Sequence, residues 1–358
     1  MQIYKEIIRP ILFNMDPEEA HGLAQSVALA TQPIWPAISG WFKYGGSDLK
    51  TTLAGVELAN PVGLAAGFDK NGKLASMLGH LGFGYAEIGS VTAKASQGNP
   101  RPRLFRLPAD EALINRMGLN GEGVDLVAER LAHTKFSLPV GLSIAKTNDP
   151  AITGDAVIQD VLYTFCKIKN LPLAYVAINV SCPNTKEGIL EEKNRAGVIF
   201  HEFQKENNQN LPILVKLSPD GSDALIEGIV EEACKEGLAG YICGNTTTTR
   251  NDLHTPMAEI ERIGSGGLSG PPLKSRALSL CRRVFKLKQP NQIIIGVGGI
   301  GSGKDAYDFI KSGASLLELY TALIYHGPTL ALQINLELSE LLRKDGLQLN
   351  QAVGLQVN

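Results

Sequence analysis

The chain has 358 residues, 44% of them hydrophobic and 20% charged, which is typical of a globular protein with one large domain or two ordinary ones. The formal net charge of -2 provides no basic excess for nucleic-acid binding, and five scattered cysteines without a CxxC pair argue against a disulfide framework or a metal site. No stretch approaches the roughly 18 apolar residues of a membrane-spanning helix, and the N-terminus lacks the pattern of a secretory signal.

Residues 1–45 are predicted to form helices. Apolar side chains in the first dozen residues recur at helical spacing, although Pro10 should kink or end that helix. A second helix should begin after Asp16, because an aspartate before a proline has the sequence of a helix cap. Its apolar face would run from Ala20 to Ala28.

A dense apolar cluster follows, formed by Trp35, Ile38, Trp41 and Phe42. Two interpretations are open at this point. The cluster docks onto the rest of the protein, or it forms a surface that enters a membrane and admits a lipid-soluble partner.

From residue 50 onward, eight short apolar runs alternate with amphipathic stretches. Runs of this kind, rich in β-branched residues, are typical of strands buried on both faces of a parallel sheet. Most intervening segments are long enough for a crossover helix, so the pattern predicts an α/β protein with a (β/α)8 TIM barrel; a doubly wound open sheet is the main alternative. The runs are Pro61–Ala66, Tyr85–Gly89, Val140–Ala145, Tyr175–Val180, Ile213–Leu217, Gly240–Cys243, Ile293–Val297 and Leu316–Tyr320.

The remaining segments complete this division of the chain. Thr51–Leu58 is predicted to be a small hairpin that closes the bottom of the barrel. We therefore expect an N-terminal helical extension in residues 1–45, a barrel domain in residues 46–345 and a loose C-terminal tail in residues 346–358.

Functional groups of such a barrel follow the C-terminal ends of its strands. The glycines of residues 296–303 follow the seventh run, where barrels often bind phosphate, although they can also serve only as turns. Lys216 lies at the end of the fifth run, next to its last residue, where a lysine can form a Schiff base, pair with a carboxylate or stabilise negative charge on a cofactor. Lys70 can form an ion pair with its neighbour Asp69.

Cys182 follows the fourth run and lies among Asn179, Ser181, Asn184 and Thr185. One interpretation is a small buried apolar residue. The polar neighbours favour another, in which the thiolate acts as a general base toward a positioned C–H proton. No histidine is adjacent to form a Cys–His pair.

Seven segments, in order along the chain, resemble the dihydroorotate dehydrogenase family: Ala65–Gly72, Glu87–Thr92, Gly98–Leu107, Ile114–Asn120, Ile178–Thr185, Gly266–Leu273 and Ile295–Ile300. Several ordered motifs of this length are highly specific. The N-terminal segment Phe13–His21 is similar to the class 2 branch, whose members associate with membranes and use a quinone.

The resemblance implies one FMN and one dihydroorotate site. Residues implied to hold FMN are Ala66, Gly67, Ser90, Asn179, Lys216, Gly270, Gly299, Tyr320 and Thr321, together with Ser143 and Gly244, which replace an expected asparagine and threonine. Residues implied to hold dihydroorotate are Lys70, Asn115, Arg116, Met117, Gly118, Leu119, Asn179, Asn184, Asn245 and Thr246. Residues implied to lie near the quinone route are His21, Arg106 and Tyr320.

The implied reaction oxidises dihydroorotate to orotate in pyrimidine synthesis. Cys182 would take the proton from C5, a hydride would pass from C6 to the flavin, and Lys216 would stabilise charge on the flavin's N1–O2 edge. Class 2 members usually have serine as this base and class 1 members cysteine, so Cys182 departs from the class 2 pattern. A quinone acceptor implies a peripheral protein on the cytoplasmic face of the cell membrane.

Two other functions are kept open. One is a related flavin oxidoreductase with another substrate or a soluble electron acceptor. The other is a flavin-free barrel that binds a phosphorylated metabolite or catalyses a lyase reaction. The sequence leaves the oligomeric state undetermined.

Overall fold

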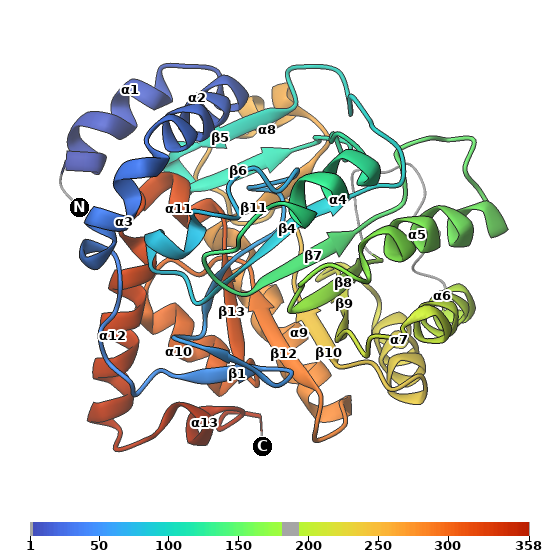
Figure 1. Ribbon diagram of the computed structural model, residues 1–358. Coiled ribbons are helices and arrows are strands. Elements are labelled where there is room, and N and C mark those ends of the chain that lie inside the picture. Colours follow the sequence, from blue (N-terminus) through green and yellow to red (C-terminus); the bar gives the residue numbers. More distant parts are fainter. Residues whose placement is uncertain (1–2, 181–192, 358) are drawn as a thin grey trace.

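The barrel predicted from the eight apolar runs is present in the computed structural model, which describes residues 3–180 and 193–357. Eight parallel strands close on themselves in chain order, and helices surround them (Figure 1). The strands are β3 (Val62–Leu64), β4 (Tyr85–Val91), β7 (Val140–Ile144), β8 (Tyr175–Asn179), β9 (Ile213–Leu217), β10 (Gly240–Cys243), β12 (Ile293–Val297) and β13 (Leu316–Leu319). The open-sheet alternative is therefore excluded.

Helices between the strands form the outer layer of the barrel. Their apolar faces cover the outer face of the strands and build the largest hydrophobic core. They are α4 (Val124–Ala132), α5 (Asp155–Ile168), α6 (Lys193–Glu206), α7 (Asp223–Lys235), α9 (Lys274–Leu287), α10 (Gly303–Lys311) and α12 (Leu330–Lys344). Two shorter helices, α8 (Met257–Ile263) and α11 (Thr321–His326), complete the connections after β10 and β13.

The predicted hairpin is confirmed as β1 (Thr51–Leu53) paired antiparallel with β2 (Val56–Leu58). Leu53 and Leu58 are buried and pack against Tyr85 and Tyr175 inside the barrel. The hairpin therefore closes the bottom of the barrel, below the strands in Figure 1.

A second, antiparallel sheet lies outside the barrel and has its own small apolar core. It consists of β5 (Leu104–Leu107), β6 (Ala112–Asn115) and β11 (Gly267–Ser269). β5 and β6 are neighbours in the sequence, whereas β11 comes about 150 residues later. The sequence did not indicate this sheet, because its strands are short, partly polar and hidden inside long barrel loops. Figure 1 places it beside the N-terminal helices.

The N-terminal segment is helical, as predicted. A π-helical turn (Tyr4–Ile8) leads into α1 (Arg9–Phe13) and then α2 (Pro17–Ala30). Pro10 does not end the first helix, because it occupies the first turn of α1, where its missing N–H costs no hydrogen bond. The Asp16 cap is confirmed, since its side chain accepts hydrogen bonds from two backbone N–H groups of the first turn.

In the apolar cluster after α2, some side chains dock onto the barrel and others are exposed, so each of the two interpretations applies to a part of it. Short helical turns include α3 (Trp35–Ile38), and Trp35 and Phe42 pack against the barrel core. Trp41 is 76% exposed. Eight large apolar side chains of residues 3–41 are exposed in the described chain: Ile3, Ile7, Ile8, Ile11, Leu23, Val27, Ile34 and Trp41.

The expectation of a loose C-terminal tail is wrong. The chain continues after α12 into α13 (Leu349–Ala352), whose two end residues are buried. Backbone hydrogen bonds from Gly354 and Gln356 to residues 310 and 311 hold the last residues against α10. Within the described residues, no helix combines the length and apolarity that crossing a bilayer requires.

Candidate active site

A cavity of about 630 Å³ opens at the C-terminal end of the barrel strands. Its walls come from the loops after β3, β4, β8, β10, β12 and β13, from the antiparallel sheet, and from α2, which contributes Glu18 and His21. This is the end at which TIM barrels carry their active sites. A volume of this size accommodates a flat cofactor and a small substrate.

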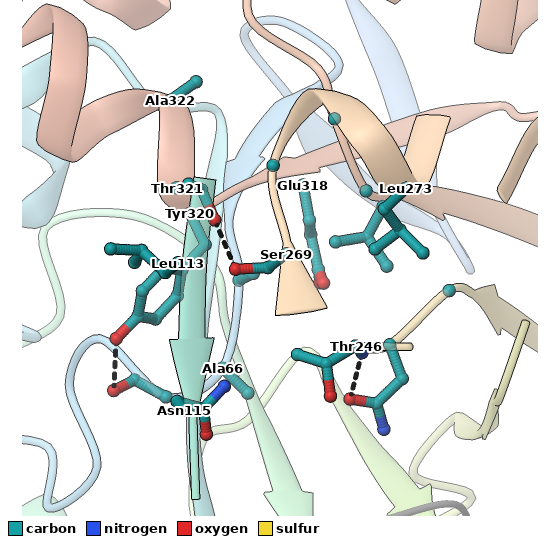
Figure 2. A pocket seen from close by; sticks show the side chains of 18 of the residues that line it. Ala66, Leu113, Asn115, Thr246, Ser269, Leu273, Glu318, Tyr320, Thr321 and Ala322 are labelled. Atoms are coloured by element: carbon teal, nitrogen blue, oxygen red, sulfur yellow. Dashed lines mark hydrogen bonds between the residues drawn. The ribbon is translucent and has the colours of Figure 1, made fainter. Parts of the chain in front are cut away.

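One wall of the cavity is built from glycine backbone. Gly299 has a φ of +74°, and a Cβ there would lie 3.0 Å from the Gly270 carbonyl oxygen, so only glycine fits. Beside it, the Thr321 hydroxyl donates to Ser269 Oγ at 2.8 Å (Figure 2). Because glycine has no side chain, the backbone N–H groups and the nearby hydroxyls are accessible from the cavity. Such donors suit a phosphate group, which the sequence predicts for this loop.

Gly244 departs from the threonine of the family pattern, and the structure gives a reason. Its φ is +133°, and a Cβ would lie 1.9 Å from the Val297 carbonyl oxygen. Because β10 and β12 approach so closely here, a side chain at position 244 requires a different backbone. Gly244 still lines the cavity.

A buried ionic group lies at the floor of the cavity. Lys216 Nζ is 2.9 Å from Glu87 Oε1 and 3.8 Å from Glu318 Oε2. Tyr175 Oη lies 3.2 Å from an oxygen of each glutamate. Lys216 therefore pairs with a carboxylate, which is one of the three roles considered for it. It also lines the cavity.

Sequence reasoning gave Glu87 and Glu318 no role. Both interrupt otherwise apolar strands that are buried on both faces. A charged residue in such a strand must find a partner inside the protein, so its occurrence together with Lys216 was a usable signal.

Amide side chains and Lys70 also line the cavity. Asn179 donates to Ser90 Oγ at 3.1 Å and lies beside Asn245, whose amide is 3.4 Å from Asn179 Oδ1. Asn115, Met117, Gly118, Leu119 and Thr246 also line the cavity. All of these residues except Ser90 belong to the set that the sequence assigns to the substrate.

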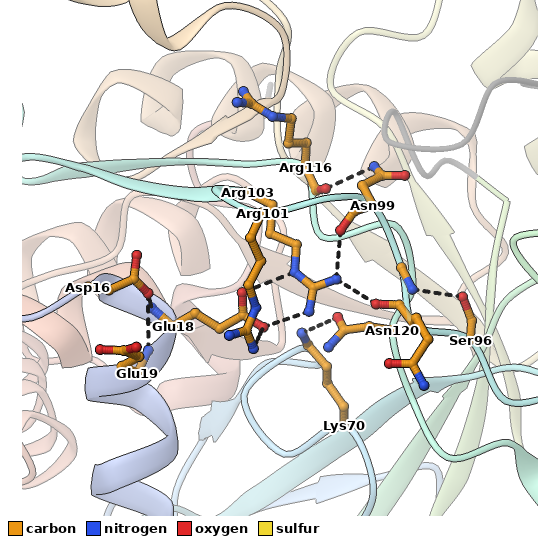
Figure 3. A network of polar contacts seen from close by, with 12 residues as sticks. Asp16, Glu18, Glu19, Lys70, Ser96, Asn99, Arg101, Arg103, Arg116 and Asn120 are labelled. Atoms are coloured by element: carbon orange, nitrogen blue, oxygen red, sulfur yellow. Dashed lines mark hydrogen bonds and ion pairs between the residues drawn. The ribbon is translucent and has the colours of Figure 1, made fainter.

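Lys70 does not pair with Asp69, contrary to one sequence interpretation. The Asp69 carboxylate accepts the backbone N–H groups of Lys73 and Leu74. Lys70 Nζ instead donates to Asn120 Oδ1 at 2.7 Å (Figure 3). Burial, followed by the charge of Arg103, lowers the pKa of Lys70 to about 8.

Three of the expected site residues have side chains that do not line the cavity. Arg116 donates to the carbonyl oxygens of residues 263 and 265 and stacks on Phe105. Ser143 is buried behind Ser90, with their hydroxyl oxygens 2.8 Å apart. Arg106 donates to the Met15 carbonyl oxygen at 2.8 Å and supports the N-terminal segment. Cys182 and Asn184 lie outside the described residues.

A polar network joins α2 to the loop that precedes β5 (Figure 3). Glu18 accepts hydrogen bonds from Arg103 at 2.6 and 3.0 Å and from Arg101 at 3.0 Å. The hydrogen bonds from Arg103 hold the pKa of Glu18 below its ordinary value. Arg103 also donates to the carbonyl oxygens of Gln97 and Asn99, so the same side chain fixes the loop that precedes β5.

Aromatic residues connect α2 with the cavity. His21 lies edge-on to Phe68 with ring centroids 4.9 Å apart, and Phe68 contacts Tyr320 in the same way at 6.0 Å. His21 Nε2 is 3.0 Å from the Phe68 carbonyl oxygen. Burial, helped by the charge of Lys70, lowers the pKa of His21. His21 and Tyr320, two of the three residues expected near the quinone route, therefore lie on one path.

Residues 3–180 and 193–357 contain no cluster of three or more histidine, cysteine or acidic side chains that could hold a metal ion.

Comparison with known proteins connects this geometry to a family. The family model described as dihydroorotate dehydrogenase matches residues 48–342. A protein of Gloeobacter violaceus named dihydroorotate dehydrogenase (quinone) is 42% identical over 99% of both chains, and one of Natronomonas pharaonis with the same name is 42% identical over 98% of this chain and 99% of its own. The ligand-free DHODH structure from Eimeria tenella has a TM-score of 0.84 at 31% identity and covers 95% of this chain and 99% of that one. The chain belongs to the dihydroorotate dehydrogenase family.

Proposed function

We propose that the protein oxidises dihydroorotate to orotate with a bound FMN and passes the electrons to a quinone. The observation that carries the proposal is a single cavity lined by two kinds of group. One kind is the glycine backbone together with Lys216, and the other is the amides together with Lys70. The relatives that cover nearly the whole chain are named for this activity with a quinone.

FMN fits the part of the lining formed by the glycine backbone and Lys216. Its phosphate would lie on the backbone near Gly299 and Thr321, and its ring over the floor formed by Ala66, Gly67 and Lys216. Bound there, the flavin supplies a hydride acceptor that no amino-acid side chain can replace. Lys216 would place a positive charge where the ring gains negative charge.

Dihydroorotate fits the amides and Lys70, because its imide groups need amide partners and its carboxylate needs a cation. Asn115, Asn179 and Asn245 supply the amides, and Lys70 supplies the cation. The proton at C5 would pass to Cys182 and the hydride at C6 to the cofactor, leaving a C5–C6 double bond. Such a polar site rejects ligands that leave its groups unpaired.

The charge of Lys70 gives a pH dependence that can be measured. A lysine with a pKa of about 8 is positively charged below that pH and neutral above it. The KM for dihydroorotate should therefore be flat below about pH 8 and rise above it, whereas Lys70→Met should have a high KM throughout. A wild-type KM that stays constant up to about pH 9.5 would contradict this role.

The quinone would approach between the N-terminal helices. Their exposed apolar side chains provide a surface that can enter the headgroup region of a membrane, and the aromatic contacts from His21 to Tyr320 lead from it to the cavity. We propose on this basis that the protein lies peripherally on a membrane, and the sequence resemblance adds that this is the cytoplasmic face of the cell membrane.

Negative charges introduced on the exposed face of α2 should weaken the proposed binding of the protein to a membrane. Leu23 and Val27 are 44% and 52% exposed, so the double change Leu23→Glu and Val27→Glu should cost little stability. It should reduce binding to phospholipid vesicles by roughly 10-fold or more, because each buried apolar side chain contributes on the order of 1.5 kcal/mol. Val198→Glu, an equally exposed position on α6, serves as the control. Unchanged vesicle binding by the double variant would remove α2 from the membrane surface.

Steady-state turnover with different electron acceptors tests the proposed function. Dihydroorotate should be oxidised rapidly with a quinone and slowly with fumarate or NAD. The cysteine at position 182 is the one feature that favours a soluble acceptor, because class 1 members carry it. Faster turnover with fumarate or NAD than with quinone would establish that alternative.

A further inference from the structure

Among the described residues, the floor of the cavity holds two carboxyl groups and one ammonium group. Lys216, Glu87 and Glu318 come from three different strands, and their side chains are 7%, 0% and 0% exposed. Two ionised carboxylates beside one ammonium group would leave an uncompensated charge in the barrel interior, which is costly. The group becomes neutral if one carboxyl group keeps a proton.

The hydrogen bonds also require one more proton. Tyr175 Oη is 3.2 Å from both Glu87 Oε2 and Glu318 Oε1, but a phenol has only one proton to donate. If a carboxyl group donates to Tyr175, which in turn donates to the other carboxylate, both contacts are satisfied. A chain of this kind is stronger than its separate hydrogen bonds.

Glu318 is the better holder of that proton. Lys216 Nζ lies 2.9 Å from Glu87 but 3.8 Å from Glu318. Glu318 Oε2 is buried and has no hydrogen-bond partner among the described residues. Glu318 also lines the cavity and is drawn among its side chains in Figure 2.

The surroundings of Glu318 agree with this assignment. The titratable groups that face it are Tyr85 and Glu87 of β4, Tyr175 of β8 and Lys216 of β9. Burial and the charge of Glu87 raise the pKa of Glu318 to about 8, although Lys216 opposes them. Burial raises the pKa of both tyrosines, and the two glutamates raise the pKa of Lys216, so these three stay protonated.

We propose that Glu318 is a positioning residue that carries a proton in the resting enzyme and, by losing it to solvent at high pH, makes the reduction potential of the bound flavin more negative. This inference rests on the proposed FMN site. The electrostatic reason is that an extra negative charge beneath a ring disfavours adding electrons to that ring. The Glu318 proton takes no part in the hydride transfer, which moves two electrons and one proton from the substrate.

The variant Glu318→Gln tests the potential, because glutamine has the size of a protonated glutamate and cannot ionise. Flavin midpoint potentials of the holoenzymes should coincide well below pH 8 and separate above it, with the wild type becoming the more negative. Glu57→Gln, on the exposed side of the bottom hairpin, should follow the wild type at every pH. Wild-type and Glu318→Gln potentials that remain parallel over the whole range would overturn the inference.

Infrared spectroscopy tests the proton without depending on flavin. The full-length protein should have a carbonyl band of a protonated carboxylic acid at neutral pH, which disappears in Glu318→Gln. The band should also disappear in Glu87→Gln, since Glu318 then becomes the sole counter-ion of Lys216 and ionises. A band that persists in both variants would overturn the assignment. A protein that binds no flavin would refute the proposed function, while the infrared result would still decide whether Glu318 holds the proton.

Discussion

Replacing Cys182 with alanine should slow flavin reduction by dihydroorotate by roughly 100-fold or more, the usual scale for losing a general base. Cys182 comes three residues after the cavity residue Asn179 in the sequence and lies outside the described residues. FMN binding should persist, because the thiol acts on the substrate side. Stopped-flow absorbance measures the rate, and an alanine variant as fast as the wild type would remove Cys182 from the mechanism.

Cys182→Ser separates two arrangements of the same site. A thiol has a reference pKa of about 8.5, whereas a serine hydroxyl is far less acidic and needs a proton relay. If the site is arranged for a thiolate, the serine variant should be slow and should need a higher pH. Serine that works as well as cysteine would indicate that the relay of the class 2 enzymes is present.

Replacing Lys216 with methionine should have the largest effect on stability. It removes the ammonium group that pairs with Glu87 and leaves this carboxylate without a charged partner among the described residues. Breaking a buried ion pair from one side costs about 3–5 kcal/mol of unfolding free energy. Denaturant unfolding of the purified variant measures this loss.

The double variant Lys216→Met with Glu87→Gln provides the control, because it removes the second charge as well. It should recover much of the lost stability but not the rate of flavin reduction. If both variants are equally unstable, lost packing rather than uncompensated charge explains the effect.

The barrel could be predicted because each strand is apolar on both faces and is followed by a segment long enough for a helix. β9, β10 and β12 begin and end at the predicted residues, β3 is shorter than predicted at both ends, and the other four strands differ by one or two residues at one end. The antiparallel sheet could not be predicted, since β11 pairs with β6 across about 150 residues and neither strand has a regular pattern. The packed C-terminus was missed because its contacts with α10 depend on the finished barrel.

Site residues could be predicted where they lie at the end of a barrel strand. They were harder to predict in loops, where a side chain can point into the cavity or away from it. Lys216 and Asn179 end buried strands, so their place at the cavity followed from the barrel itself. Arg116 lies just beyond β6, and its guanidinium group points to backbone carbonyls instead of the cavity. The link between Glu18 and Arg103 joins positions 85 residues apart and has no local signal.

The central claim is that one cavity holds a flavin and dihydroorotate in contact. Anaerobic mixing of the purified protein with dihydroorotate tests it most directly, with the flavin absorbance and the orotate formed followed together. The flavin should bleach, and one orotate should form per flavin. Flavin that stays oxidised in the presence of saturating dihydroorotate, with no orotate formed, would contradict it.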